Sequence, residues 1–383
     1  MTTVLLTALE ASGDALGADL MRALKRRDPG VRFVGVGGAE MQAGGLSSPF
    51  DIAELSVVGL LDGLLAYRRA DRRAAEIAAL AAREAPDIAV LIDSWGFSYL
   101  LARRLKRAMP VLPLVKYVAP QAWATRPGRA KALAQSFDQL LSIIAFEAPL
   151  FEAAGAKVAF VGHPALADDL PKGAPGRLRE RIGARVDEPI LLVLPGSRNS
   201  EVARLMPPFE DAVKRLKAAR PDLHVVVAPA PTVAERVVAR TAGWPFRAHL
   251  ILDAEGRRDA MAGADVALAC SGTVTTELAV AGCPMVVAYR LGPASYAIAK
   301  RIVRTRFITL INIAADAAVA PELIQGECTG ERLAGELSRR LDDPVFRQAQ
   351  REAQWAALDA LGGRGPPPAE RAADAILGAL TRS

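Results

Sequence analysis

Short apolar runs alternate with amphipathic stretches along the first part of the chain. Charged residues recur at helical spacing between the runs, as in residues 17–27. Continuous apolar runs that are separated by helices are typical of a parallel sheet covered on both faces. The runs lie at residues 3–9, 32–38, 87–94, 113–120, 139–146 and 157–164. The pattern predicts an α/β fold with a doubly wound parallel sheet.

The pattern stops at residues 161–177, which are rich in Pro, Gly and Asp, and then begins again. The second set of apolar runs lies at residues 189–194, 223–231, 249–253, 264–270 and 284–291. Both halves open with a strand, a turn of small residues and a helix, in "LLTALEASGD" and "LLVLPGSRNSE". We therefore expect two Rossmann-like domains that face each other across a cleft. They comprise residues 1–165 and 189–345, with a linker at 166–188 and C-terminal helices at 346–383 that pack back on the first domain.

Length and composition fit this organisation and narrow the class of protein. The 383 residues are enough for two domains, and no run approaches the roughly 18 to 20 apolar residues that cross a bilayer. The N-terminus lacks the pattern of a signal peptide, so we expect a cytoplasmic protein. The three cysteines and three histidines are scattered, which favours packed, reduced thiols over a disulfide or metal site.

Charge favours acidic partners. The net charge is +6 and the pI is near 9.4, which suits nucleic acid, anionic lipid or phosphorylated metabolites. Aromatic residues are only 5% of the chain, and the basic clusters lack the interleaved aromatics that stack on single strands. Nucleic acid is therefore the least favoured of the three.

The first candidate for chemistry is "LPGSRNSEV" (194–202), where a strand turns into a helix. Gly196 allows backbone N–H groups to approach an anion closely, Ser197 is a candidate helix cap, and Arg198 adds a bidentate cation at the positive end of the helix dipole. The turn predicts a phosphate or diphosphate site; a capped turn with a solvent-facing Arg is the alternative. A Walker motif and G-x-G-x-x-G are both absent, which disfavours nucleotide hydrolysis and hydride transfer.

A second turn of the same kind follows the run at 264–270. Ser271, Gly272 and Thr273 begin a helix, and Glu277 lies one turn further along the same face. A carboxylate at that position can accept hydrogen bonds from a ribose diol; a solvated helix residue is the alternative. Two such turns in one domain favour a nucleotide diphosphate.

The first domain has carboxylates where a dinucleotide fold has its glycine-rich loop. Glu10 and Ser12 lie between the first strand and helix, which suits hydroxyl groups better than a diphosphate. Asp93 ends another strand and is a candidate general base, with helix N-capping as the alternative. In the segment 117–131, Trp123 and Arg126 form a candidate phosphate or lipid contact; an ordinary helix with a basic face is the alternative.

An apolar patch at residues 57–65 is followed directly by arginines. Core burial of a helix is the default interpretation, but this combination is also what anchoring to an anionic membrane surface needs. The candidate membrane or acyl-chain contacts are Val57, Val58, Leu60, Leu61, Leu64, Leu65, Arg68 and Arg69.

These motifs, in this order, resemble those of the lipid-A-disaccharide synthases, inverting glycosyltransferases of GT-B architecture. The resemblance covers most of the chain through "EASGD" (10–14), "ELSVVGLLDGL" (54–64), "YVAPQAWATRPGR" (117–129), "LPGSRNSEV" (194–202), "SGTVTTELA" (271–279), "CPMVVAYR" (283–290) and "PELIQGECT" (321–329). The chain departs from the family pattern in three places. Asp93 lacks the second Asp that usually follows, Thr125 replaces a Trp, and Ile311 replaces a Pro before Asn312.

The resemblance implies a reaction and its residues. UDP-2,3-diacylglucosamine transfers its sugar to the 6-hydroxyl of 2,3-diacylglucosamine 1-phosphate, giving a β-1′,6-linked disaccharide phosphate and UDP. Arg198 and the turn amides of 196–199 and 271–273 would stabilise the departing diphosphate without a metal or cofactor. Asp93 would be the base, with Glu10 as its rival.

Further implied positions complete the expected site. Glu277 would hold ribose, Asn312 would lie on the nucleotide side, and Arg290 would bind substrate. The acyl chains give the leucine patch a purpose, at the inner face of the bacterial inner membrane; the oligomeric state stays open. Two alternatives remain: another GT-B enzyme of UDP-sugars, such as a peptidoglycan-precursor transferase or a UDP-N-acetylglucosamine 2-epimerase, and a non-catalytic UDP-sugar or lipid-binding protein.

Overall fold

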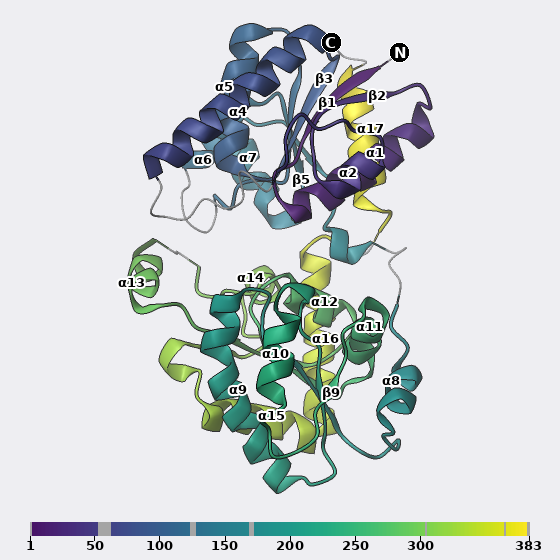
Figure 1. The fold of residues 1–383 in the computed structure, drawn as a ribbon, viewed down its shortest axis with the longest axis vertical. Helices are drawn as coiled ribbons and strands as arrows, with labels where there is room; N and C mark the ends of the chain where they lie inside the picture. The colour runs from purple at the N-terminus through teal and green to yellow at the C-terminus, as the bar shows by residue number, and fades with distance from the viewer. Residues whose placement is uncertain are drawn as a thin grey trace. The chain divides into compact units, whose positions relative to one another are not determined.

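The computed structural model describes residues 2–52, 63–122, 128–167, 172–302, 305–363 and 365–380. The chain divides into two compact units, one of residues 1–169 with 365–383 and one of residues 170–364. Each contains one six-stranded parallel sheet with helices on both faces, which confirms the predicted α/β class (Figure 1). Among the described helices, none is long and apolar enough to span a membrane.

The sheet of the first unit has the strand order β2-β1-β3-β4-β5-β6. Its strands are β1 (Thr3–Thr7), β2 (Arg32–Val36), β3 (Ile88–Ile92), β4 (Leu114–Tyr117), β5 (Gln139–Ser142) and β6 (Val158–Phe160). Because both faces are covered, the described strand interiors are almost wholly apolar and buried, as the continuous runs in the sequence predicted.

Helices cover the two faces of this sheet with separate apolar clusters. One face packs against α1 (Ala11–Arg27), α2 (Ala39–Ala43) and α17 (Pro368–Leu380). The other face packs against α4 (Gly63–Glu84), α5 (Trp95–Ala108), α6 (Gly128–Ser136) and α7 (Ala148–Ala153). The crossovers bring the carboxyl ends of β1, β3 and β4 to one edge, where ligands of such folds bind.

The sheet of the second unit has the order β12-β11-β10-β7-β8-β9. Its strands are β7 (Ile190–Leu194), β8 (His224–Val227), β9 (His249–Leu250), β10 (Val266–Cys270), β11 (Met285–Tyr289) and β12 (Glu322–Ile324). The short β12 is a strand that the apolar runs did not predict. Since β7 pairs with β10, with Leu194 opposite Ala269, the two predicted anion turns begin side by side.

One large apolar cluster joins this sheet to helices on one face, α9 (Asn199–Ala219), α10 (Ala234–Thr241) and α15 (Gly330–Asp342). The other α-helices described in this unit are α8 (Pro175–Ile182), α11 (Ala254–Gly263), α12 (Thr273–Val280), α13 (Pro293–Ile302), α14 (Leu310–Ala315) and α16 (Pro344–Ala360). The three cysteines of the chain are free and buried, and burial raises the pKa of Cys270 and Cys283 to about 12.

The C-terminal helices divide between the two units, whereas the sequence predicted that they pack together on the first domain. Helix α16 belongs to the second unit, where Gln350 donates to the Met285 carbonyl at 2.8 Å and Gln354 to the Cys283 carbonyl at 3.0 Å. Helix α17 lies beside α1 in the first unit (Figure 1), and Arg27 pairs there with Glu370 and Asp374. Tertiary contacts of each helix decide this division.

Candidate active site

The Arg198 turn lies directly after β7 and needs glycine at residue 196. Gly196 has φ +111°, and a Cβ atom there would lie 2.8 Å from Glu201 Oε2 and 2.9 Å from Glu201 Cβ. Both the left-handed backbone and this close approach exclude larger residues. Helix α9 begins at Asn199 with Arg198 as its N-cap residue, so Ser197 is not the cap that the sequence predicted.

Glu201 occupies part of the predicted anion site. Its Oε2 accepts hydrogen bonds from the backbone N–H groups of Ser197 at 3.0 Å and Arg198 at 3.2 Å. These two amides therefore already have an anionic partner, which corrects the expectation that they face a diphosphate. The Arg198 side chain is 76% exposed and contacts Glu201 Oε1 with one nitrogen at 3.2 Å, so most of its donors face solvent.

The second turn follows β10 and is open at its helix end. Helix α12 begins at Thr273 with Gly272 as N-cap, and the Thr275 hydroxyl donates to the Gly272 carbonyl at 2.8 Å. The Ser271 N–H donates to the Ala288 carbonyl at 3.3 Å and is thus used within the sheet. The Thr275 N–H also donates to the Gly272 carbonyl, at 3.1 Å, and the helix dipole places positive charge at this end of α12.

Both turns line one cavity of about 290 Å³. The predicted residues Gly196, Ser197, Arg198, Ser271, Gly272 and Thr273 all lie on its wall. Other lining residues are Leu194, Glu201, Ala228, Ala230, Arg257, Cys270 and Val274. The pairing of β7 with β10 brings the turns together although more than 70 residues separate them in the sequence.

Arg257 is a cation of this cavity that the sequence analysis missed. It comes from α11, whose sequence "AEGRRDAMAG" reads as an ordinary amphipathic helix, so no local signal identifies it. Its guanidinium lies 3.8 Å from the carboxylate of Glu277. Glu277 is not among the residues that line the cavity; it is paired with Arg257, which is.

Asn312, which the resemblance places on the nucleotide side, is engaged in hydrogen bonds inside the second unit. It is fully buried, its side-chain nitrogen donates to the Ala320 carbonyl at 2.7 Å and to Glu322 at 2.8 Å, and its oxygen accepts from the Ala320 N–H at 2.9 Å. All of its polar atoms are therefore used inside the protein. In this structure Asn312 ties α14 to β12 and offers nothing to a nucleotide.

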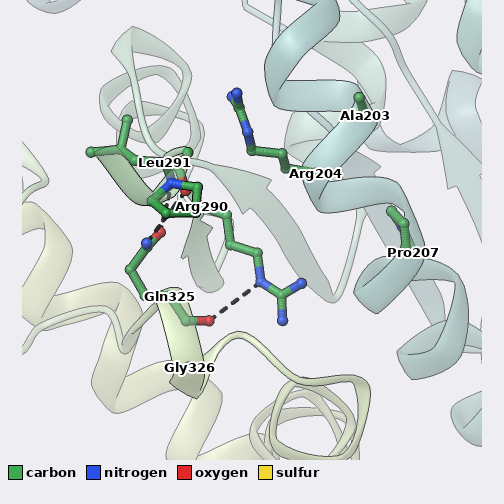
Figure 2. Close-up of a pocket in the computed structure, with 9 residues that line it drawn as sticks. Ala203, Arg204, Pro207, Arg290, Leu291, Gln325 and Gly326 are labelled. Atoms are coloured by element: carbon green, nitrogen blue, oxygen red, sulfur yellow. Dashed lines mark hydrogen bonds between the residues drawn. The ribbon is translucent and has the colours of Figure 1, made fainter. Parts of the chain in front are cut away.

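Arg290 lines a second cavity, of about 450 Å³, at the carboxyl end of β11 (Figure 2). It donates to the backbone carbonyls of Gln325 and Cys328, so its side chain is fixed by the loop that follows β12. Figure 2 shows Arg204 of α9 on the opposite wall. The other lining residues are small or uncharged: Ala203, Pro207, Leu291, Gly292, Pro293, Gln325 and Gly326.

Three predicted residues of the first unit, Glu10, Ser12 and Asp93, follow the carboxyl ends of β1 and β3. Asp93 follows β3 and is half-buried, and the Ser94 hydroxyl donates to the Glu10 carboxylate at 3.1 Å. The N-cap of α5 is Ser94 rather than Asp93. Among the described residues, the Asp93 side chain makes no hydrogen bond and no ion pair. Ser12 is exposed in the first turn of α1.

Several predicted residues lie outside the described residues. Trp123 and Arg126 belong to this group, as do Val57, Val58, Leu60 and Leu61. Leu64 and Leu65 fall within α4, where the structure describes the backbone but not their side chains. Arg68 and Arg69 of the same helix are exposed.

The two units define the class of this protein. Solved structures of the same fold include a Staphylococcus aureus MnaA–UDP co-structure, with TM-score 0.64 and 15% identity over 98% of this chain and 95% of that one. MurG of Acinetobacter baumannii has TM-score 0.60 and 17% identity over 99% of this chain and all of that one. The fold is thus that of GT-B glycosyltransferases and related UDP-sugar epimerases.

Sequence comparison specifies the family within this class. The family model described as lipid-A-disaccharide synthetase matches residues 4–361. The lipid-A-disaccharide synthase of Rhodospirillum centenum is 41% identical, over 99% of this chain and 95% of its own length. That of Ruegeria pomeroyi is 42% identical, over 98% and 95%. The chain belongs to the lipid-A-disaccharide synthase family and is a glycosyltransferase of lipid A biosynthesis, which confirms the resemblance seen in the sequence.

Proposed function

We propose that the second unit binds UDP-2,3-diacylglucosamine and that the first unit activates the 6-hydroxyl of 2,3-diacylglucosamine 1-phosphate. The transfer passes through an oxocarbenium-like state in which the diphosphate gains negative charge and the hydroxyl loses a proton. The observation that carries this proposal is the single cavity that both anion turns and Arg257 line.

The diphosphate lies in this cavity between Arg198 and the N-terminus of α12. The exposed guanidinium of Arg198 supplies a bidentate cation, and the N-terminal end of the α12 dipole adds partial positive charge. Both act where charge develops on the leaving group, which is the arrangement that lowers a transition-state barrier. Arg257 lines the same cavity and pairs with Glu277, whose carboxylate accepts hydrogen bonds from the ribose hydroxyls.

The proton of the acceptor hydroxyl passes to Asp93. Its carboxylate is half-buried and has no competing side-chain partner among the described residues, so it is free to accept a hydrogen bond from a hydroxyl. Glu10 already accepts a hydrogen bond from Ser94, which makes it the weaker candidate.

A UDP-release assay with both lipid substrates tests the assignment. We expect Asp93→Asn to lower kcat on the order of 10²- to 10⁴-fold, the range usual for loss of general-base catalysis, and Glu10→Gln to lower it far less. The matched control is Asp71→Asn, which breaks a surface ion pair with Arg104 of 2.6 Å in the same unit. Full activity of Asp93→Asn would remove this residue from the mechanism.

We propose in addition that the protein binds peripherally to an anionic membrane through the start of α4. Arg68 and Arg69 are exposed there, beside Tyr67, which is 58% exposed. Each arginine near an anionic surface contributes about 1 kcal/mol. The substrates carry acyl chains, so an enzyme that takes them from a bilayer needs such a surface.

A further inference from the structure

A buried lysine lies directly beneath the carboxyl edge that carries Asp93. Lys116 is in β4 opposite Leu91 of β3, and its side chain is fully buried. A charged residue inside a strand of a covered parallel sheet costs free energy unless all its donors are used. The sequence reads "PLVKYVAP", in which this Lys interrupts an otherwise apolar run.

The ammonium group donates to three backbone carbonyls and to no side chain among those the structure describes. Its acceptors are the carbonyls of Leu91 at 3.1 Å, of Tyr117 at 3.3 Å and of Asp93. An ammonium has three N–H donors, so this arrangement satisfies it completely. Burial lowers the pKa of Lys116 to about 7, and the negative charge of Asp93 opposes this shift.

The Asp93 carbonyl lies in the turn after β3, and the Tyr117 carbonyl ends β4 directly before the next turn; both turns have unusual backbone conformations. Asp93 and Ser94 have φ +48° and +40°, and Val118, which follows Tyr117, has φ +70°. Left-handed conformations cost energy for residues other than glycine, and most of all for a β-branched residue such as Val. Such strain persists only where surrounding interactions fix it, and it concentrates at functional sites.

Other hydrogen bonds fix the same peptide groups. The Ser98 hydroxyl donates to the Asp93 carbonyl at 2.7 Å, and the Asp93 N–H donates to the Tyr117 carbonyl at 2.9 Å. Lys116 adds a side-chain link to this backbone link, since it donates both to the Asp93 carbonyl and to the Tyr117 carbonyl.

We infer that Lys116 is a positioning residue for the transfer reaction: it holds the strained turns after β3 and β4 so that the Asp93 carboxylate faces the acceptor hydroxyl. Lys116 acts through Asp93 and touches no reacting atom. The inference rests on the proposed role of Asp93 as the base.

A double-mutant cycle in the full-length protein tests the inference. Lys116→Met keeps the length of the side chain but removes its charge and donors. We expect it to lower kcat for UDP release on the order of 10- to 100-fold while the donor KM changes less than about threefold, because the donor binds the other unit. In the Asp93→Asn background the same substitution should lower kcat by no more than about threefold, since the residue through which it acts is already lost.

Two further variants complete the design. Gln139→Met replaces another buried polar residue of the same sheet, at the first position of β5, and should leave kcat within about twofold of wild type. Lys116→Gln retains an amide donor and should have a kcat between those of wild type and Lys116→Met, which also provides a test if the Met variant does not fold. Folding is followed by circular dichroism for every variant.

The possible outcomes separate the two proposals. If Asp93→Asn is impaired but Lys116→Met has wild-type kcat, the positioning role is wrong and the proposed base stands. Equal losses from Lys116→Met in both backgrounds mean a general structural role and also overturn the inference. Full activity of Asp93→Asn would overturn the base assignment, and the role of Lys116 with it.

Discussion

Replacement of Arg198 by Ala separates binding chemistry from structure at the first anion turn. The side chain is 76% exposed, and its one ion pair, with Glu201, spans three residues at 3.2 Å. Exposed pairs of this kind contribute about 0.2 to 0.5 kcal/mol. The main-chain hydrogen bonds to Glu201 do not depend on the Arg198 side chain and remain in the variant.

The expected stability loss is therefore small. A change below about 1 kcal/mol lowers Tm by at most roughly 2 to 4 °C for a domain of about 150 to 250 residues. The catalytic loss is expected to be much larger. Removal of one donor that stabilises developing negative charge typically costs about 10²- to 10³-fold in kcat, or about 3 to 4 kcal/mol.

The assay combines UDP release with thermal unfolding. Arg215→Ala is the matched control, because Arg215 lies on the same helix, is about half exposed and pairs with Asp211 at 3.0 Å. It should lose as little stability as Arg198→Ala but keep wild-type turnover. The reasoning is refuted if Arg198→Ala retains turnover within about threefold of wild type. It is equally refuted if the variant is inactive only because it unfolds, since that result favours a purely structural capped turn.

Two further predictions concern pH and membrane binding. Burial lowers the pKa of His163 from 6.5 to about 4. The unfolded chain therefore binds this proton more tightly than the folded protein, and the free energy of unfolding falls as the pH drops from 6.5 towards 4. The total loss is on the order of 3 kcal/mol. His163→Asn should flatten this part of the stability curve in urea titrations, and an unchanged curve contradicts the assignment. Joint replacement of Arg68 and Arg69 by Glu should weaken co-sedimentation with phosphatidylglycerol vesicles at least tenfold at low salt. Undiminished binding would exclude this surface.

The Arg198 turn shows what local sequence does and does not determine. The order of strand, Gly196 and helix was sufficient to predict an anion turn, because a close backbone approach and a helix N-terminus are local properties. The carboxylate of Glu201 was not taken into account, although it lies only three residues beyond Arg198. Its burial against the turn depends on how α9 packs on the sheet, and that packing decides which amides stay free.

The sequence by itself determined the class of fold, the strands whose interiors are apolar, and the turns after them, because periodicity and turn chemistry are written into neighbouring residues. It also determined the family, through the order of its motifs. Tertiary structure alone decided that two distant turns share one cavity with Arg257 and that Asn312 is buried. It also placed the buried Lys116 ammonium against the Asp93 carbonyl. These are contacts between segments far apart in the chain, and only strand order and packing bring such segments together.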